Sequence, residues 1–314
     1  MHTVAGLGKK LLDRTLALLL ALCSLGVGLL FPLLVLTVLV KEARLAINTF
    51  GLSFLVNTTW DPVAQQFGGA TMVVGTLLST FLSLLIAVPV AIGVAIFQTE
   101  MAPRWLRPIT ASLVELLASI PSIVYGMWGF LVLAPIMAQK VEPFLQKSLG
   151  QLPLVGKLFD GTPTGIDLLT TSVILSLMIM PFMASVIKDA FQMVPPVMKE
   201  SAYAMGATRW EVIRKVVMPY TMSAMVGGAI LATGRALGET MAVAFLAGNT
   251  PQIPRSLLDS FTTITVALAN QFTEADTDLY LSSLYYLSLL LFLVSITLLA
   301  VSKYLLARFE GRTS

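Results

Sequence analysis

Cysteine and histidine are nearly absent from this chain of 314 residues, which contains one of each, Cys23 and His2. A single cysteine cannot form an internal disulfide, and the two residues offer too few ligands for a Cys-rich or His-rich metal site. Ser-His and Cys-His nucleophilic catalysis likewise lack the necessary parts. We therefore expect no catalytic residues and no metal site, which disfavours a conventional hydrolase or metalloenzyme.

Charged residues are also scarce, at 12% of the chain, whereas hydrophobic residues make up 56% and the mean hydropathy is +0.86. A soluble domain of this length would need a more polar surface than this composition can provide. The formal net charge of +3 has to be interpreted from where Lys and Arg fall relative to a membrane. The composition indicates an all-α polytopic membrane protein that contacts lipid, with no indication of nucleic-acid binding.

Long apolar runs are abundant, and runs of about 20 residues are needed to cross the hydrocarbon core as a helix. The sequence predicts six such spans, at residues 15–40, 71–97, 109–138, 168–187, 220–246 and 279–301. The first is longer than the roughly 7 to 15 apolar residues of a signal peptide, so we expect it in the mature protein. Proline and glycine within several spans, such as Pro121 and Gly238, predict kinks and close packing but are ordinary in membrane helices.

The distribution of Lys and Arg among the loops predicts the orientation of the chain. Thirteen of the 20 fall at the two termini and in the second and fourth loops, including Lys9, Lys10 and Arg14 before the first span and Lys303, Arg308 and Arg312 after the last. The first, third and fifth loops hold six, and Arg235 lies inside a span. By the positive-inside rule, both termini are expected to be cytoplasmic.

Three charged residues fall inside predicted spans, namely Arg235, Glu239 and Glu115. A charge at this depth costs from about 3 to more than 10 kcal/mol, so such residues usually face a protein interior or a water path and have a partner. Arg235 and Glu239 are four residues apart, which predicts that they share one helix face. They indicate a transport pathway. The alternative is a buried ionic network that holds the third and fifth spans in register without touching substrate.

Hydroxyl groups near these charges could add donors to the same pathway. Ser119, Ser122 and Tyr125 flank Pro121, and Thr240 follows Glu239. Ser and Thr often bond neighbouring helices in membranes, and we favour that structural role for these four residues.

The fourth loop, residues 188–219, is too polar to span the membrane and too apolar to be a plain linker. Thr208 and Glu211 have the spacing of a capping box, which predicts a short amphipathic helix from that point. A second short helix is expected over residues 197–205, and Gly206 can take the left-handed conformation that reverses the chain between them. An interfacial loop on the lipid headgroups, which Trp210 would suit, remains an alternative.

The same loop resembles a motif of the permease subunits of binding-protein-dependent ABC importers, E-A-A-x-x-x-G-x9-I-x-L-P. The matching positions are Glu200, Ser201, Ala202, Gly206, Val216, Met218 and Pro219, with Ser201, Val216 and Met218 departing to residues of similar size. The resemblance implies a coupling-helix pair that docks into a groove of a separate ATPase. We expect the docking surface to include Glu200, Ala202, Gly206, Thr208, Trp210 and Pro219.

Residues 114–129, 199–213 and 234–249 further resemble the phosphate-specific members of this family. The resemblance implies a type I ABC importer permease fold in a prokaryotic inner membrane. It implies one permease domain over residues 1–314, with an added N-terminal helix at 15–40, core helices at about 71–301 and the coupling loop at 188–219. The implied partners are a second permease subunit (PstA-like), an ATPase homodimer (PstB-like) and an extracytoplasmic phosphate-binding protein (PstS-like).

The chain contains no G-x-x-x-x-G-K-[ST] run, the motif that cradles ATP phosphates. ATP and Mg²⁺ are therefore expected to act in the partner ATPase, with no cofactor bound by this chain. Within the resemblance, we expect Arg235 to meet phosphate transiently, because a guanidinium presents paired donors to its oxygens. Glu239, with Glu115 as a further candidate, would partner Arg235 when the path is empty.

Three alternatives remain open from the sequence. A permease of the same architecture could carry sulfate or molybdate. A secondary transporter or channel working without ATP would use an intramembrane ion pair equally well. An inert membrane scaffold would explain neither the fourth loop nor the buried arginine.

Overall fold

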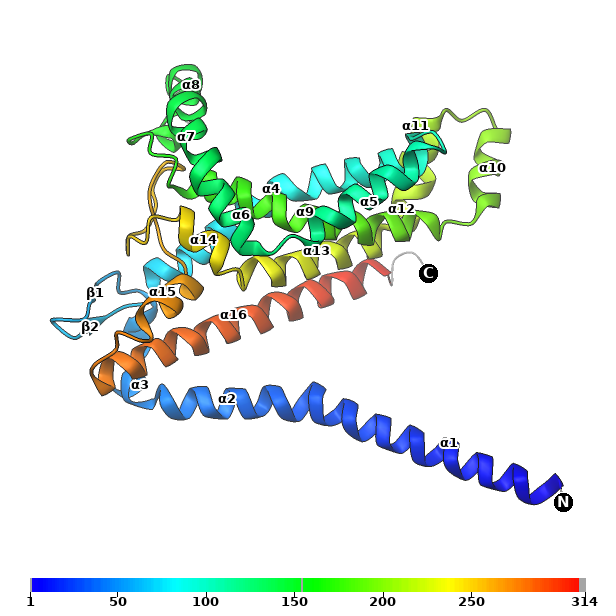
Figure 1. The fold of residues 1–314 in the computed structure, drawn as a ribbon, viewed down its shortest axis with the longest axis horizontal. Coiled ribbons are helices and arrows are strands. Elements are labelled where there is room, and N and C mark those ends of the chain that lie inside the picture. The colour runs from blue at the N-terminus through cyan, green and yellow to red at the C-terminus, as the bar shows by residue number, and fades with distance from the viewer. Residues whose placement is uncertain (1, 154, 311–314) are drawn as a thin grey trace.

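The computed structural model describes residues 2–153 and 155–310, and Arg312 of the predicted C-terminal basic cluster lies outside them. Most helices run along the long axis of the molecule, which therefore has two distinct ends (Figure 1). One end carries both termini and α10 (Pro196–Ala204), and we name it the α10 end. The other carries the hairpin of β1 (Trp60–Asp61) and β2 (Gln66–Phe67), and we name it the hairpin end.

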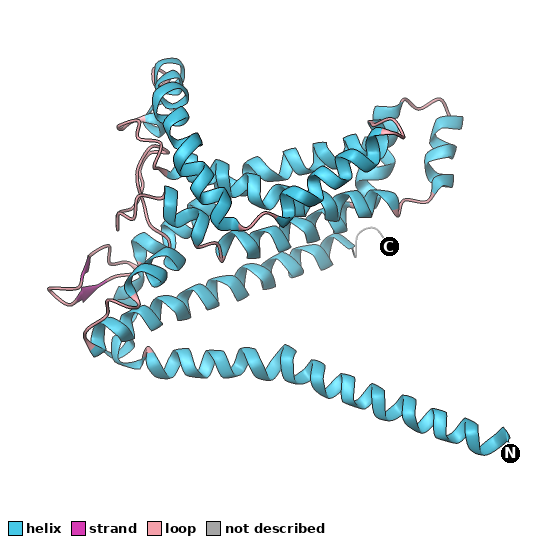
Figure 2. Ribbon diagram, in the orientation of Figure 1, coloured by secondary structure: helices cyan, strands magenta, loops and turns pink. Residues whose placement is uncertain are grey.

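The chain is helical over most of its length (Figure 2). The remaining α-helices are α1 His2–Leu25, α2 Phe31–Glu42, α3 Arg44–Phe50, α4 Ala70–Ile96, α5 Leu106–Ser119, α6 Ser122–Trp128, α7 Ala134–Ile136, α8 Glu142–Leu149, α9 Leu168–Gln192, α11 Arg209–Val212, α12 Met218–Tyr220, α13 Met222–Leu237, α14 Met241–Leu246, α15 Ile264–Gln271 and α16 Asp278–Glu310. Wider π-helical turns at Gly26–Leu30, Phe97–Met101, Gly129–Leu133, Met137–Val141 and Ile213–Val217 continue or join several of them, and short 3-10 helices lie at Gly51–Leu55 and Gly156–Phe159.

Five continuous helical segments in the described residues are long and apolar enough to cross a membrane. They are Arg14–Glu42, Ala70–Met101, Ser122–Leu149, Leu168–Gln192 and Asp278–Tyr304. A sixth is obtained when Arg209–Tyr220 and Met222–Leu237, which meet at a bend of 68°, are counted together. The predicted number of six is therefore reached only with a broken helix.

The predicted span 109–138 was wrong as one continuous helix, because it is interrupted at Ile120 and Pro121. Helix α5 ends at Ser119, and both following residues are extended, with ψ of 128° and 140°, before α6 begins at Ser122. A proline disfavours the helical conformation of the residue before it and cannot continue the backbone hydrogen bonds of α5. Pro121 therefore favours a turn here, although Pro89 and Pro181 lie within continuous helices.

The predicted span 220–246 was also wrong as one helix. Helix α13 ends at Leu237, Gly238 forms its C-terminal cap, and α14 begins at Met241. Arg235 lies in the last turn of α13 and Glu239 lies beyond it, so the two do not share one helix face. The expectation of an i to i+4 pair fails because the helix ends between them.

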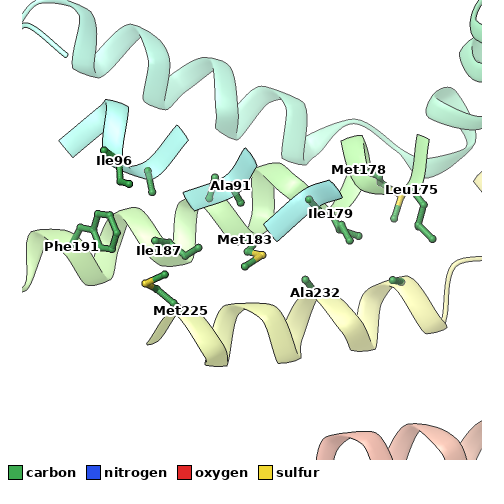
Figure 3. Packing of buried hydrophobic residues seen from close by; sticks show 14 of the residues in the cluster. Ala91, Ile96, Leu175, Met178, Ile179, Met183, Ile187, Phe191, Met225 and Ala232 are labelled. Carbon is green, nitrogen blue, oxygen red and sulfur yellow. The ribbon is translucent and has the colours of Figure 1, made fainter. Parts of the chain in front are cut away.

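Helix α9 is the central element of the largest hydrophobic core. It lies between α4 and α13, and Figure 3 shows its side chains packed between Ala91 of α4 and Met225 and Ala232 of α13. The α9 residues that are at most 1% exposed include Leu175, Met178, Ile179, Met183, Ile187 and Phe191. Small residues on the two flanking helices let them approach α9 closely, which is how helices associate in membranes.

A second core joins the start and the end of the chain at the hairpin end. Ser282 of α16 accepts a hydrogen bond from Ala46 N at 3.1 Å and donates one to Glu42 O at 2.7 Å. Tyr286 adds a bond to Gly51 O at 3.1 Å. The segment Arg14–Glu42 otherwise diverges from the body toward the N-terminus, and no residue in the most apolar part of it is buried (Figure 1).

Candidate functional site

The two helix breaks lie against each other, because α6 packs on α14. A Cβ atom added at Gly126 of α6 would lie 2.8 Å from Phe245 Cδ2 and 2.9 Å from Ala242 Cα, so only glycine allows this approach. The Tyr125 hydroxyl donates to Leu117 O at 2.9 Å and so bridges the break between α5 and α6. The two interrupted spans thus meet at this point. Inside a membrane, such non-helical backbone is tolerated only where protein covers it or where it faces a water-filled space.

Arg235 projects from the last turn of α13 at this junction, and its side chain is exposed in the isolated chain. It lies close enough to the Tyr125 hydroxyl for its positive charge to act on that group electrostatically. Among the described residues, Arg235 forms no ion pair. The guanidinium is therefore available for an anionic ligand or for a group of another subunit.

Glu239 is half-buried and is held by the backbone rather than by Arg235. Its Oε1 accepts a hydrogen bond from Ala242 N at 3.2 Å, which satisfies a free N–H at the start of α14. Its carbonyl oxygen accepts from Thr265 Oγ1 at 2.8 Å, which ties the break to α15. The predicted ion pair with Arg235 is not formed, because the carboxylate caps α14.

Glu115 does not approach Arg235 either, which corrects the expected partnership. Its carboxylate lies 3.7 Å from Lys188 Nζ, and its side chain is 64% exposed. Helix α5 packs along α9, so the nearest cation to Glu115 is at the C-terminal end of α9 toward the α10 end. The predicted network of three charges is therefore absent from the described residues.

Hydroxyl groups around the breaks donate mainly to the backbone. Ser119 Oγ donates to Leu116 O at 2.8 Å, and Thr240 Oγ1 donates to Gly238 O at 3.4 Å. Ser122 is half-buried at the first position of α6. Together with the Tyr125 bond, this arrangement favours a structural role for these residues, which hold the chain at its two turns.

The loop between α9 and α13 has the predicted helix, glycine and helix arrangement. Gly206 has φ of +86°. Its N–H bonds to Tyr203 O at 2.9 Å and the N–H of Ala207 bonds to Ala202 O at 3.1 Å, which is the Schellman pattern that ends a helix. The predicted capping box is confirmed, with Thr208 N donating to Glu211 Oε2 at 2.9 Å and Glu211 N to Thr208 Oγ1 at 3.3 Å.

Large apolar side chains project from this loop. Met205 is 83% exposed and Trp210 is 59% exposed, while Glu200 is also exposed. Ala202 is buried under the pair, and Pro219 lies at the first turn of α12. An exposed apolar surface of this kind on an ordered helix pair is suited to binding another protein.

Two buried carboxyl groups were missed from the sequence. Glu142 at the start of α8 and Asp167 before α9 are both 0% exposed, and both accept a hydrogen bond from Thr170. Acidic residues in a predicted loop are normally assumed to be solvated, so the sequence did not indicate that these two are buried. Asp167 could have been found as a helix cap, because it directly precedes an apolar run and its Oδ1 accepts from Thr170 N at 2.8 Å.

No group of three or more His, Cys, Asp or Glu residues that could hold a metal ion occurs within the described part of the chain.

Comparison with known proteins identifies similar sequences over most of the chain. Residues 87–314 match the model of the family described as "Binding-protein-dependent transport system inner membrane component". The "Phosphate transport system permease protein PstC" of Mesorhizobium japonicum is 50% identical over 268 residues, covering 85% of this chain and 82% of that protein. The protein of the same name from Pasteurella multocida is 47% identical over 278 residues, covering 88% and 87%.

Solved structures share the fold at low sequence identity. A bacterial alginate ABC transporter in complex with an alginate pentasaccharide-bound periplasmic protein matches with a TM-score of 0.61 at 16% identity, covering 98% of each chain. An inward-facing MetNI methionine ABC transporter matches with a TM-score of 0.51 at 18% identity, covering 82% of this chain and 97% of that one. These likenesses show the importer permease fold.

Proposed function

The chain belongs to the family of binding-protein-dependent transport system inner membrane components, and from that premise we propose that it is the permease subunit of an ATP-driven importer of inorganic phosphate. The observation that carries the proposal is its 50% identity to a phosphate permease over 85% of its length. The fold supports it, because the neighbouring solved structures are ABC importers. The whole chain, residues 1–314, then forms one permease domain.

The chemical work of the importer belongs to a partner. Because this chain lacks the motif that cradles ATP phosphates, ATP and Mg²⁺ act in a separate PstB-like ATPase homodimer. The helix pair α10 and α11 is the proposed docking element for that ATPase. Its rigid Gly206 corner and exposed Met205 and Trp210 support this role.

The remaining partners follow from the two ends and the exposed faces of the molecule. A PstS-like binding protein delivers phosphate at the hairpin end, which is then extracytoplasmic. A PstA-like second permease subunit covers exposed apolar residues of α5 and α6 such as Leu116, at 62% exposed, and Val124, at 49% exposed. With α10 facing the ATPase, both termini lie in the cytoplasm of a prokaryotic cell and the chain resides in its inner membrane.

Arg235 is the proposed point of contact between this subunit and phosphate. It lies at the junction of two broken spans, and no carboxylate of the described chain neutralises it. A guanidinium can give two parallel hydrogen bonds to phosphate oxygens. The carboxylate of Glu239, four residues away but engaged in capping α14, lowers the local positive potential, so that phosphate is released rather than retained.

Labelled-phosphate uptake in cells that contain this chain and its three partners tests this function. The wild type is compared with Arg235→Gln, Arg235→Lys and the control Arg104→Gln, which alters an exposed arginine of the second loop. We expect uptake to be abolished by Gln, partly restored by Lys and unchanged in the control, at equal membrane levels and equal ATPase binding. Retained uptake in Arg235→Gln would remove that residue from the pathway.

The choice of substrate is tested in the same cells with labelled sulfate and molybdate. Uptake of either anion in place of phosphate would overturn the substrate while leaving the permease assignment intact. Uptake that persists without the ATPase would instead favour a secondary transporter. The exposed α10 and α11 surface argues against that alternative, because a transporter without a docked ATPase has no use for it.

A further inference from the structure

A cavity of about 240 Å³ lies at the α10 end, far along α9 from the helix breaks. It is partly open and is bordered by the π-helical turn Phe97–Met101, α5, the end of α9 and α10. The side chains that line it are those of Gln98, Thr99, Glu100, Arg107, Ala111, Lys188, Phe191, Gln192 and Lys199. Three of them are cations and one is a carboxylate, so the lining carries an excess of positive charge.

The carboxylates present do not fully satisfy the three cations. Lys199 of α10 is paired tightly with Glu100 at 2.5 Å. Lys188 is only 14% exposed, yet its nearest carboxylates, Glu115 and Asp189, lie at 3.7 and 3.6 Å, beyond ordinary charge-assisted hydrogen bonds. Both acids are more than half exposed, so water weakens their pull on Lys188.

Arg107 has donors to spare on the same side of the cavity. Its Nε donates to Ala102 O at 3.0 Å, which fixes the side chain against the turn that precedes α5. The terminal nitrogens of its guanidinium have no hydrogen bond to a described residue, and the side chain forms no ion pair among them. A guanidinium held by one edge offers its other donors to an oxyanion in a fixed geometry.

Gln98 lies at the edge of the cavity with its side-chain amide buried. It is 4% exposed, and its Nε2 donates to Thr110 O at 3.0 Å. Its Oε1 is buried without any hydrogen-bond partner, which is costly for a polar atom. Because Oε1 is closed off even to water, the groups left to bind a ligand in the cavity are the cations, which favour a ligand that carries negative charge.

We propose that this cavity binds a phosphate group, either free monohydrogen phosphate or the headgroup of a hydroxylated anionic lipid such as phosphatidylglycerol. The phosphate oxygens accept from Arg107, Lys188 and Lys199. The volume is below the roughly 300 to 1,000 Å³ of pockets for drug-sized ligands, so it suits one phosphate group rather than a nucleotide.

Binding there would brace α10 against the membrane helices. Lys199 precedes Glu200 in the helix pair, while Arg107 and Lys188 belong to α5 and α9. One anion that bonds all three therefore links the loop to two spans. Arg235 does not line this cavity, so the inference stands independently of the transport role proposed for that residue.

The first arm of the test measures binding of radiolabelled phosphate to the purified chain in phosphatidylcholine nanodiscs. We expect saturable binding that is weakened at least about tenfold in Arg107→Gln and Lys199→Gln, since each removes a charged hydrogen-bond donor. Arg104→Gln, from the same loop but outside the cavity, and Lys199→Arg should bind like the wild type. Arg235→Gln, which lies outside the cavity, should keep the cavity binding.

The second arm counts phosphatidylglycerol molecules retained by the same proteins in native mass spectrometry. Retention by the wild type and Arg104→Gln but not by Arg107→Gln or Lys199→Gln, without saturable phosphate binding, assigns the site to a lipid headgroup. Size-exclusion profiles confirm that the variants remain folded. If neither ligand depends on Arg107 and Lys199, or if phosphate binding is lost only in Arg235→Gln, the inference is overturned.

Discussion

Glu239 is stabilised at membrane depth without a cationic partner, because its carboxylate accepts the Ala242 N–H at the start of α14. Glutamine keeps an acceptor oxygen at this position, whereas alanine leaves the N–H unsatisfied. We expect Glu239→Ala to lower the free energy of unfolding by about 0.5–2 kcal/mol, the range for a lost helix cap, and Glu239→Gln to change it little.

Uptake separates the capping role of Glu239 from its charge. Glu239→Gln should remain stable but transport phosphate more slowly, because Arg235 then holds the anion more tightly. Denaturation of the purified variants and initial rates of uptake are the two measurements. Equal uptake in Glu239→Gln and the wild type would leave this residue with a capping role alone.

Asp167 gives a residue-scale prediction about pH. Burial raises the pKa of Asp167 above its usual value of 3.8, although hydrogen bonds from Thr170 act in the opposite direction. Glu142 is a second buried carboxyl group beside it, and two neighbouring buried carboxyl groups cannot both ionise at low cost. An acid with a raised pKa holds its proton more tightly in the folded protein, so its contribution to stability falls as the pH rises from about 3.8 through the raised value.

Asn at position 167 keeps the helix cap and removes the titrating group. We therefore expect the melting temperature of the purified chain to fall more steeply for the wild type than for Asp167→Asn as the pH rises above about 3.8. Asp167→Ala should be less stable than Asp167→Asn throughout, because it loses the cap. Parallel pH profiles for the wild type and Asp167→Asn would contradict the raised pKa of Asp167.

The sequence located the charged residues but not their partners. Arg235 and Glu239 stand out because charges are rare within apolar runs. Which groups they meet depends on where α13 ends and how α5 packs along α9, and neither is encoded within a few residues. Lys188, Arg107 and Lys199 served only to predict orientation, since a cavity formed by separate helices leaves no local pattern.

At the scale of elements, Gly206 allows a direct test of the corner between α10 and α11. Its φ is +86°, and a Cβ there would meet nothing within 4 Å, so substitution costs only backbone strain. We expect Gly206→Ala to destabilise the corner by about 1–2 kcal/mol and to weaken binding to the ATPase. Gly227→Ala in α13 is the matched control, because its added Cβ also meets nothing but the backbone is helical.

The control should be neutral or slightly stabilising, since alanine favours a helix interior over glycine. Pull-down of the ATPase and denaturation of the isolated chain provide the two readings. A Gly206→Ala variant that binds the ATPase like the wild type would remove the corner from the docking surface.

The helix pair was predictable from sequence and the helix breaks were not. Thr208, Glu211 and Gly206 act within a few residues of one another, so their spacing was sufficient. Pro121 and Gly238 were noticed, but both residue types are common in continuous membrane helices. The breaks become necessary only when α6 meets α14 at Gly126, a contact between segments more than 100 residues apart.

At the scale of the whole molecule, the proposed orientation predicts which ends can be labelled from each side. In a Cys23→Ser background, Val63→Cys places a thiol at the hairpin, where the side chain is 96% exposed, and Met205→Cys places one at 83% exposure. A membrane-impermeant maleimide should label position 63 in spheroplasts and position 205 in inverted vesicles. The reverse pattern would invert the chain.

Composition and hydropathy predicted a polytopic helical chain with five or six long apolar segments, because the bilayer sets the length of each helix, but they misplaced the bounds of the third and fifth spans. Two features of the arrangement depend on long-range packing and could not be predicted from the sequence. These are the central place of α9 and the divergence of α1 from the body.

The bonds from Ser282 to Ala46 and Glu42 join residues 236 and 240 positions apart. During synthesis the first helix leaves the ribosome long before α16 is made. It must therefore remain in the bilayer without α16 to pack against. Contacts of such separation form late, and incomplete chains expose unpaired surfaces meanwhile. A truncation that removes α16 therefore leaves the earliest helices without a final position, and quality-control proteases should clear such products faster than chains shortened only after Glu310.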